Sequence, residues 1–282
     1  MKTLILYLLV FLSILNHQTI ILENQKILSF FLYQLLPSLF ILCILIQLLP
    51  FPKTKSYKLQ LLNINTNTLY LIIKMILLGI PTSAYLINQL VKEKQINETQ
   101  GKRLIHCICI PSISFMLMTI PFLKNLKFAL ILFTIHCISS FILLFITRNN
   151  EIYIELNIKN NTLSNALLFT IKSMAFILSY LFIIVSLKSL FIYYIPSLNN
   201  IIHLFFEFSS GISTYINHSY SLFYCLICIG FSGLCAHLQI MNGCDFINLD
   251  YKVFLFYRIV HCLCNLLLFG CFQFITQILH FF

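Results

Sequence analysis

The chain has 282 residues, of which 60% are hydrophobic and only 9% are charged, and its formal net charge is +10. Soluble domains carry about 25% charged residues, so this composition excludes a water-soluble globule. Apolar runs alternate with short polar stretches, and a run of about 20 apolar residues spans a bilayer as a helix. The unbroken runs also exclude a β-barrel, whose strands alternate in polarity. We therefore predict an all-α polytopic membrane protein.

Composition narrows the chemistry further. No dense basic run alternates with aromatic residues, so no nucleic-acid partner is predicted, and the positive charge indicates membrane orientation and contact with the lipid bilayer. The 11 Cys lie mostly inside apolar runs, where Cys behaves as a small hydrophobe. We predict no metal and no cofactor. No nucleophile–base pair, phosphate loop or metalloprotease motif is present, which argues against an enzyme.

The predicted segments begin with an apolar run at 3–22. This run resembles a signal peptide but lacks a small-residue cleavage site, so a retained helix is expected within an N-terminal unit, 1–29. Eight further segments follow at 27–51, 68–87, 104–122, 128–147, 166–187, 189–206, 219–240 and 253–280. Basic residues on both sides of 68–87 suggest that either 27–51 or 68–87 re-enters the membrane, and the sequence leaves the choice between them open.

Several of these segments contain helix breakers near their middle. Proline removes a helical hydrogen bond and clashes with the preceding turn. A break at membrane depth is tolerated where it is buried in protein or lines a cavity, although plain kinks are the simpler alternative. The breakers, with the hydroxyl side chains that follow them, are candidate substrate-binding residues: Pro37, Ser38, Gly79, Pro81, Thr82, Ser83, Pro111, Ser112, Gly230 and Gly233.

An acidic residue lies within an apolar run at Glu207. An ionised carboxylate is costly in hydrocarbon unless it faces a cavity or a partner, so it is a candidate functional residue. Ser209, Ser210 and Gly211 follow directly, and this composition predicts the tip of a re-entrant hairpin. The alternative is an interfacial acid at a helix end. An ionised Glu207 would repel an anionic solute unless it were protonated, bound to a cation or neutralised by Arg103, Arg258, Lys172 or His237.

The stretch 230–239 likewise combines glycines with polar side chains inside an apolar run. Gly230 and Gly233 free the backbone, and donors and acceptors are supplied by Ser232, His237 and Gln239. On a regular helix His237 and Gln239 would not share a face, but beyond a break they could. We predict that these three polar side chains belong to the same binding site as Glu207.

A short motif occurs twice. Residues 103–109 read RLIHCIC and residues 258–264 read RIVHCLC. Each copy follows a Gly-containing break and a polar loop, so the order of features is shared. A duplicated unit is therefore predicted, with a first repeat at 30–122, connecting helices at 123–199 and a second repeat at 200–282. The His and Cys of each copy could bind a soft metal, but core packing is the favoured interpretation, and chance in a biased composition remains the alternative to duplication.

These motifs together resemble the YlbJ/SpoVV family of sporulation integral membrane proteins. That family belongs with gate, or nucleoside-recognition, membrane domains that are distantly like concentrative nucleoside transporters. Five stretches carry the resemblance, in the family's order: 35–45, 79–86, 103–112, 207–211 and 230–239. Each stretch alone is weak, but five in order are fairly specific.

The resemblance implies two related, inverted repeats with broken helices and re-entrant hairpins. It also implies transport of dipicolinic acid across the outer forespore membrane, on the mother-cell side of a sporulating bacterium. The expected partners are then the bilayer, a small anionic or aromatic solute and a coupling ion. Two other functions stay open: a non-transporting membrane factor required for spore assembly, and a nucleoside-type transporter. Broken helices favour transport, because a scaffold needs no polar midplane.

Overall fold

The structure is a computed structural model that describes residues 2–50, 57–120, 124–149, 152, 154 and 162–281. It is 80% helical. Within the described residues, five helical stretches are long and apolar enough to cross a membrane: His17–Leu48, Leu126–Ile146, Leu163–Tyr194, Ser221–Gly243 and Tyr251–Phe274. The prediction of an all-α multi-pass membrane protein is thereby confirmed at the level of fold class.

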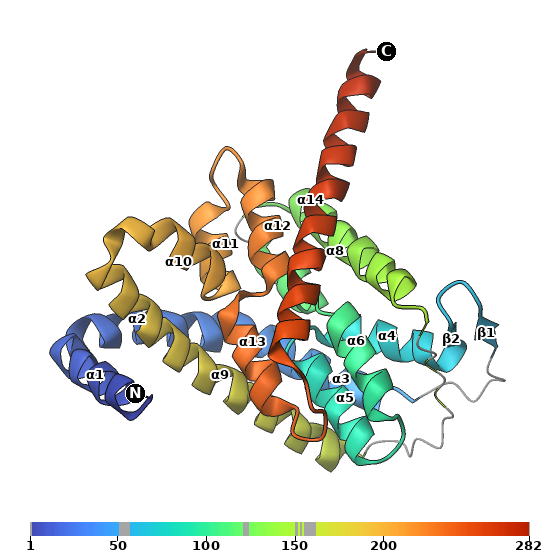
Figure 1. The fold of residues 1–282 in the computed structure, drawn as a ribbon, viewed down its shortest axis with the longest axis horizontal. Helices are drawn as coiled ribbons and strands as arrows, with labels where there is room; N and C mark the ends of the chain where they lie inside the picture. The colour runs from blue at the N-terminus through green and yellow to red at the C-terminus, as the bar shows by residue number, and fades with distance from the viewer. Residues whose placement is uncertain are drawn as a thin grey trace.

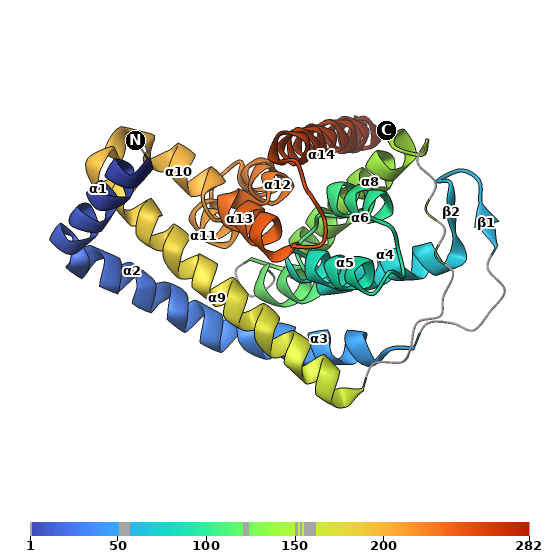
Figure 2. The same cartoon turned by 60° about the horizontal axis from the view of Figure 1, so that its bottom comes forward.

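The two longest helical stretches lie side by side (Figure 2). One consists of α2 (His17–Phe30), a π-helical turn η1 (Phe31–Leu35) and α3 (Leu36–Leu48), and the other is α9 (Leu163–Tyr194). Asn24 donates to Ser186 Oγ at 2.9 Å, near the far end of α9. The two stretches therefore run antiparallel and form one layer of the molecule.

The first helix boundary differs from the prediction. A helix at 3–22 and a polar loop near 23–26 were expected, but α1 (Lys2–Leu15) ends at Asn16 and α2 continues through the polar residues. No Gly or Pro occurs in 23–26, and Lys26 pairs with Glu23 one turn away, at 2.5 Å. Because the charges of Glu23 and Lys26 pair along the helix, these polar residues do not end the helix.

Two further segment predictions were wrong in detail. Segments 166–187 and 189–206 were predicted to be separate, but α9 passes through 188 without interruption and ends only before Pro196. The predicted break at Pro37 is absorbed by the π-helical turn just before it, so the helix continues. Ser38 Oγ donates to the carbonyls of Gln34 and Leu35, both at 3.0 Å, and so adds a donor to the turn in which proline has none.

The central part of the chain folds into shorter helices (Figure 1). Its elements are β1 (Lys58–Leu59), β2 (Ile64–Asn65), α4 (Thr66–Leu78), α5 (Thr82–Lys92), α6 (Glu98–Cys107), η2 (Phe115–Thr119) and α8 (Leu126–Ile146). The β1–β2 hairpin was not predicted. It forms in the polar stretch between helices, where Asn65 caps α4 by accepting from Thr68 N at 2.8 Å.

The last part of the chain completes the body. Its elements are η3 (Pro196–Leu198), α10 (Asn199–Phe205), α11 (Phe208–Tyr215), α12 (Ser221–Phe231), α13 (Gly233–Gly243) and α14 (Tyr251–Phe281). Helices α10 and α11 form a hairpin, and α14 packs against α12 and α8 before its C-terminal half projects from the body (Figure 1). Every break predicted from Gly79–Pro81, Pro111 and the 230–233 stretch falls between two helices.

Candidate solute site where helix breaks cross

The first break packs against another break. Gly79, between α4 and α5, has a φ of 67°, which favours glycine. A Cβ at this position would lie 1.9 Å from the backbone nitrogen of Ser112, in the extended stretch after α6. Next to it, Ile80 N donates to Ile110 O at 2.8 Å, and the Ile80–Pro81 bond is cis. Two interrupted helices therefore touch at their interruptions.

The second break repeats this arrangement. Gly233, at the start of α13, has a φ of 66°, and a Cβ there would lie 3.0 Å from Phe208 N and 3.2 Å from Glu207 Cα. The amide of Cys235 donates to Phe206 O at 3.0 Å. The α12–α13 break thus meets the tip of the α10–α11 hairpin, as the α4–α5 break meets the stretch after α6.

A small cavity lies where these crossings approach each other. Its volume is about 40 Å³, enough for a few water molecules. It is lined by Leu35, Leu39, Ile80, Pro81, Pro111, Ser112, Phe115, Ile177, Leu181, Glu207, Phe208, Ser209, Cys235, Ala236 and Gln239. Six of the sequence-predicted residues are among them: Pro81, Pro111, Ser112, Glu207, Ser209 and Gln239. Side chains from both the first and the last part of the chain meet here, with α9 and α3 supplying the apolar wall.

Glu207 is buried at the hairpin tip and caps α11. Its carboxylate accepts from Ser209 N at 2.9 Å, Ser209 Oγ at 2.7 Å and Ser210 N at 2.7 Å. Three hydrogen-bond donors in the first turn of α11 thus pair with the oxygens of this carboxylate. The capping bonds explain why an acid is tolerated here, and the carboxylate still borders the cavity.

The basic group linked to Glu207 is one that the sequence did not single out. Lys188, buried on α9, donates from Nζ to Ser210 Oγ at 2.9 Å, and Ser210 N binds the Glu207 carboxylate. The four basic residues considered from sequence were Arg103, Arg258, Lys172 and His237. Of these, Arg103, Arg258 and His237 contact backbone carbonyls. The sequence does show Lys188 within the apolar run 163–194. Because a helix boundary was expected at 188, this lysine was interpreted as a residue at the end of a segment.

Several predicted residues shape the site without lining the cavity. Pro37 and Ser38 lie on α3, and Ser38 O accepts from Ser114 Oγ at 3.2 Å. Thr82 and Ser83 are buried in the first turn of α5. The sequence pattern therefore identified these residues because they lie near the break, and they do not line the cavity.

The remaining predicted residues lie around the second crossing. Gly211 packs the hairpin closely, because a Cβ there would lie 2.5 Å from His203 O, and at Gly230 a Cβ would lie 2.7 Å from Asn265 Nδ2. Ser232 has a φ of 72° at the break. His237 Nε2 lies 2.7 Å from Phe231 O, a carbonyl at the end of α12. These groups hold the broken backbone in shape.

Two buried arginines tie neighbouring helices together. Arg258 on α14 donates to Cys109 O at 3.1 Å and to His106 O, at the C-terminal end of α6. Arg103 on α6 donates to Leu144 O at 2.8 Å, at the C-terminal end of α8. Each guanidinium therefore satisfies carbonyls that a helix end leaves unpaired.

The fold and the site define a polytopic helical membrane protein with interrupted helices around a small central cavity. Comparison of the chain with protein-family models, with curated proteins and with solved structures finds no match.

Proposed function

We propose that the protein is a membrane transporter of a small solute, with dipicolinic acid as the solute and the outer forespore membrane as the location. The substrate and the membrane rest on the resemblance to the YlbJ/SpoVV family. One observation carries transport itself: four interruptions from distant parts of the chain meet in pairs at one cavity bordered by a buried carboxylate and an amide. Broken helices at a shared polar site are typical of secondary transporters.

We also propose that 30–122 and 200–282 are two related units of inverted orientation, joined by 123–199. Two parallels support this proposal. In each unit a glycine with positive φ, Gly79 or Gly233, lets one break press against a second. In each unit the arginine of the repeated heptapeptide, Arg103 or Arg258, binds carbonyls at the C-terminal end of a neighbouring helix. On this view the α10–α11 hairpin re-enters the membrane.

The cavity is too small for a substituted aromatic ring, so the proposal requires a second, more open state. Opening must separate the crossings, which are held together by backbone contacts such as Ile80 N to Ile110 O and Cys235 N to Phe206 O. In this proposal Lys188, which binds Ser210 Oγ and does not line the cavity, supplies positive charge near the site. Glu207 either couples transport to a proton or holds the hairpin tip in place.

A test uses purified protein in liposomes and uptake of radiolabelled pyridine-2,6-dicarboxylate. Wild-type protein should accumulate the solute above protein-free liposomes. Glu207→Gln keeps the size and one accepting oxygen but cannot titrate, so a coupling role predicts lost accumulation with normal membrane abundance. Retained accumulation in Glu207→Gln would exclude a proton-coupling role for Glu207.

Ser213→Ala, on the same hairpin with an exposed hydroxyl, is the matched control. No uptake by any well-folded wild-type preparation, with pyridine-2,6-dicarboxylate or with nucleosides, would contradict transport and favour a non-transporting membrane factor. Uptake of nucleosides alone would favour the nucleoside-type transporter.

A further inference from the structure

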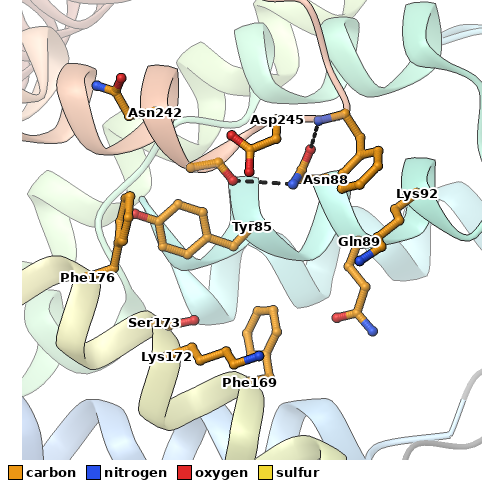
Figure 3. A pocket seen from close by; sticks show the side chains of 12 residues that line it. Tyr85, Asn88, Gln89, Lys92, Phe169, Lys172, Ser173, Phe176, Asn242 and Asp245 are labelled. Atoms are coloured by element: carbon orange, nitrogen blue, oxygen red, sulfur yellow. Dashed lines mark hydrogen bonds between the residues drawn. The ribbon is translucent and has the colours of Figure 1, made fainter.

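A second and larger cavity lies beside the candidate site, and most of the residues that line it belong to no motif of the sequence analysis. It is a groove of about 340 Å³ between α5 and α9, closed at one end by the end of α13 and the loop after it (Figure 3). Small-molecule sites begin at about this volume. The groove is lined by Tyr85, Asn88, Gln89, Lys92, Phe169, Lys172, Ser173, Phe176, Asn242, Gly243, Asp245 and Phe246.

The two walls have a matching pattern. On each helix the lining residues are spaced three, four and seven positions apart, which is one helical face. On α5 this face runs from Tyr85 to Lys92, and on α9 it runs from Phe169 to Phe176 with Lys172 between them. Each wall therefore presents aromatic or amide groups and one lysine.

The chemistry of the groove favours a small organic anion. Lys92 and Lys172 supply positive charge from opposite walls, whereas Asp245 is the one acidic residue of the lining. Aromatic rings form much of the remaining surface, and Tyr85 and Phe176 meet edge to face with centroids 5.5 Å apart. A flat apolar body carrying a carboxylate matches rings flanked by ammonium groups.

The groove and the central cavity share a wall. Tyr85 lines the groove, and its hydroxyl donates to Gln239 O at 3.4 Å, while Gln239 lines the cavity. The Gln239 amide donates in turn to Ile177 O at 3.3 Å, next to Phe176. A rearrangement of these few groups would connect the two spaces.

We propose that this groove is a binding site for a small organic anion with a planar apolar body, and that it is the outer site from which the solute passes Tyr85 to reach the cavity. The proposal of a binding site rests on the groove alone, whereas the proposal that the solute passes through it rests on the proposed transport function.

Asn88 fixes the loop that closes the groove, because it donates to Gly243 O at 3.3 Å and accepts from Phe246 N at 2.9 Å (Figure 3).

The chain contains no Trp, so one introduced Trp gives a fluorescence signal without background. Phe176→Trp in purified protein would be titrated with pyridine-2,6-dicarboxylate, benzoate and uncharged benzamide in phosphatidylcholine nanodiscs. We expect a saturable change in Trp fluorescence with both anions and little change with benzamide. Replacing both Lys92 and Lys172 by Gln should weaken anion binding roughly tenfold, as expected for two solvent-exposed ion pairs. Lys94→Gln with Lys252→Gln, two lysines outside the groove, should leave it unchanged.

Phe169→Trp provides a second reporter on the same wall should Phe176→Trp fold poorly. Equal responses to benzoate and benzamide, or no effect of the paired lysine change, would overturn the proposal. So would a signal that appears only in phosphatidylglycerol nanodiscs without added anion, because it would assign the groove to a lipid headgroup.

Liposome uptake with the same preparations separates the two proposals. Lysine-dependent anion binding without uptake by the wild type would retain the groove as a binding site and contradict transport. Uptake that persists without any binding in the groove would contradict the groove and retain transport.

Discussion

Gly79 illustrates how a single residue controls the site. It combines a positive φ with direct contact between two backbones, so a side chain there meets both backbone strain and steric overlap. Backbone strain alone costs about 1–3 kcal/mol, and Ser112 N cannot move without shifting the neighbouring break. The sequence predicted a break from the Gly-Ile-Pro triplet, but the partner of this break is set by packing between segments 30 residues apart.

Gly79→Ala should therefore lower thermal stability markedly. Gly270→Ala is the matched control, because nothing lies within 4 Å of a Cβ at that helical position, and alanine there should be neutral or slightly stabilising. Seven of the eleven cysteines are buried, so a thiol-reactive dye reports unfolding in detergent. Equal midpoints for the two variants would show that the crossing is not tightly packed.

Arg258 is the second residue whose role depends on its neighbours. It is fully buried and its guanidinium reaches two carbonyls from one side chain. The two carbonyls are bound by different guanidinium nitrogens, whereas lysine presents all its donors from one nitrogen. Arg258→Lys should therefore leave one buried acceptor unpaired, at a cost of about 1–3 kcal/mol. Arg148→Lys, an exposed arginine, serves as control in the same dye assay. A wild-type midpoint for Arg258→Lys would mean that the carbonyls find other donors.

At the scale of elements, the sequence predicted the interruptions better than the boundaries. Glycine, the acidic hairpin tip and two of the three prolines act on the local backbone, so their effects could be read from neighbouring residues. Pro37 is the exception, because the π-helical turn before it lets the helix continue. The boundaries near 24 and 188 depended on whether polar residues find partners within or between helices, as Asn24 does on α9. The link from Lys188 to Glu207 and the pairing of Tyr85 with Gln239 are tertiary contacts, and for that reason no local pattern revealed them.

The loop after α13 is joined to α6 by an exposed carboxylate. Glu98 binds Lys102 at 2.7 Å and accepts from Asn248 N at 3.0 Å. The hydrogen bond from Lys102, and then that from Asn248, lowers the pKa of Glu98 below its usual 4.5. A lowered pKa in the folded state favours the carboxylate, so the stabilisation is present above the unfolded-state pKa and is lost as the pH falls through the lower, folded-state value.

Acidification below about pH 4.5 should therefore weaken the wild type, and Glu98→Gln should reduce that dependence. Thermal unfolding followed by far-ultraviolet circular dichroism across pH 3 to 6, roughly centred on the ordinary carboxyl range, measures the difference. Lys102→Met should remove part of the effect, whereas Lys94→Met should preserve it. An unchanged pH profile in Glu98→Gln would assign the acid sensitivity to other carboxylates.

At the scale of the whole molecule, the proposed transport function would require the parts that enclose the cavity to separate. Phe115 on η2 and Phe208 on α11 both line it, and their rings meet edge to face with centroids 5.3 Å apart. They belong to the two proposed units. Relative movement of these units should therefore change the distance between the two rings.

Cysteines at these two positions, joined by a short bis-methanethiosulfonate linker, should stop solute uptake, and reduction should restore it. The protein that carries these two cysteines must first have its accessible native cysteines replaced: Cys137, Cys262, Cys264 and Cys271. The single-cysteine variants, treated identically, are the controls. Full uptake with complete crosslinking would show that the two rings stay together during transport.

The antiparallel pair of long helices has a consequence for the surrounding lipid. Each is 32 residues long, and at about 1.5 Å per residue each measures about 48 Å. A hydrocarbon core is about 30 Å thick, so these helices must lie strongly tilted or extend beyond it. Because the pair also walls the cavity through Leu35, Leu39, Ile177 and Leu181, a change in acyl-chain length would alter the tilt and, with it, the shape of the cavity. A change in bilayer thickness would thus act as a mechanical force on the protein.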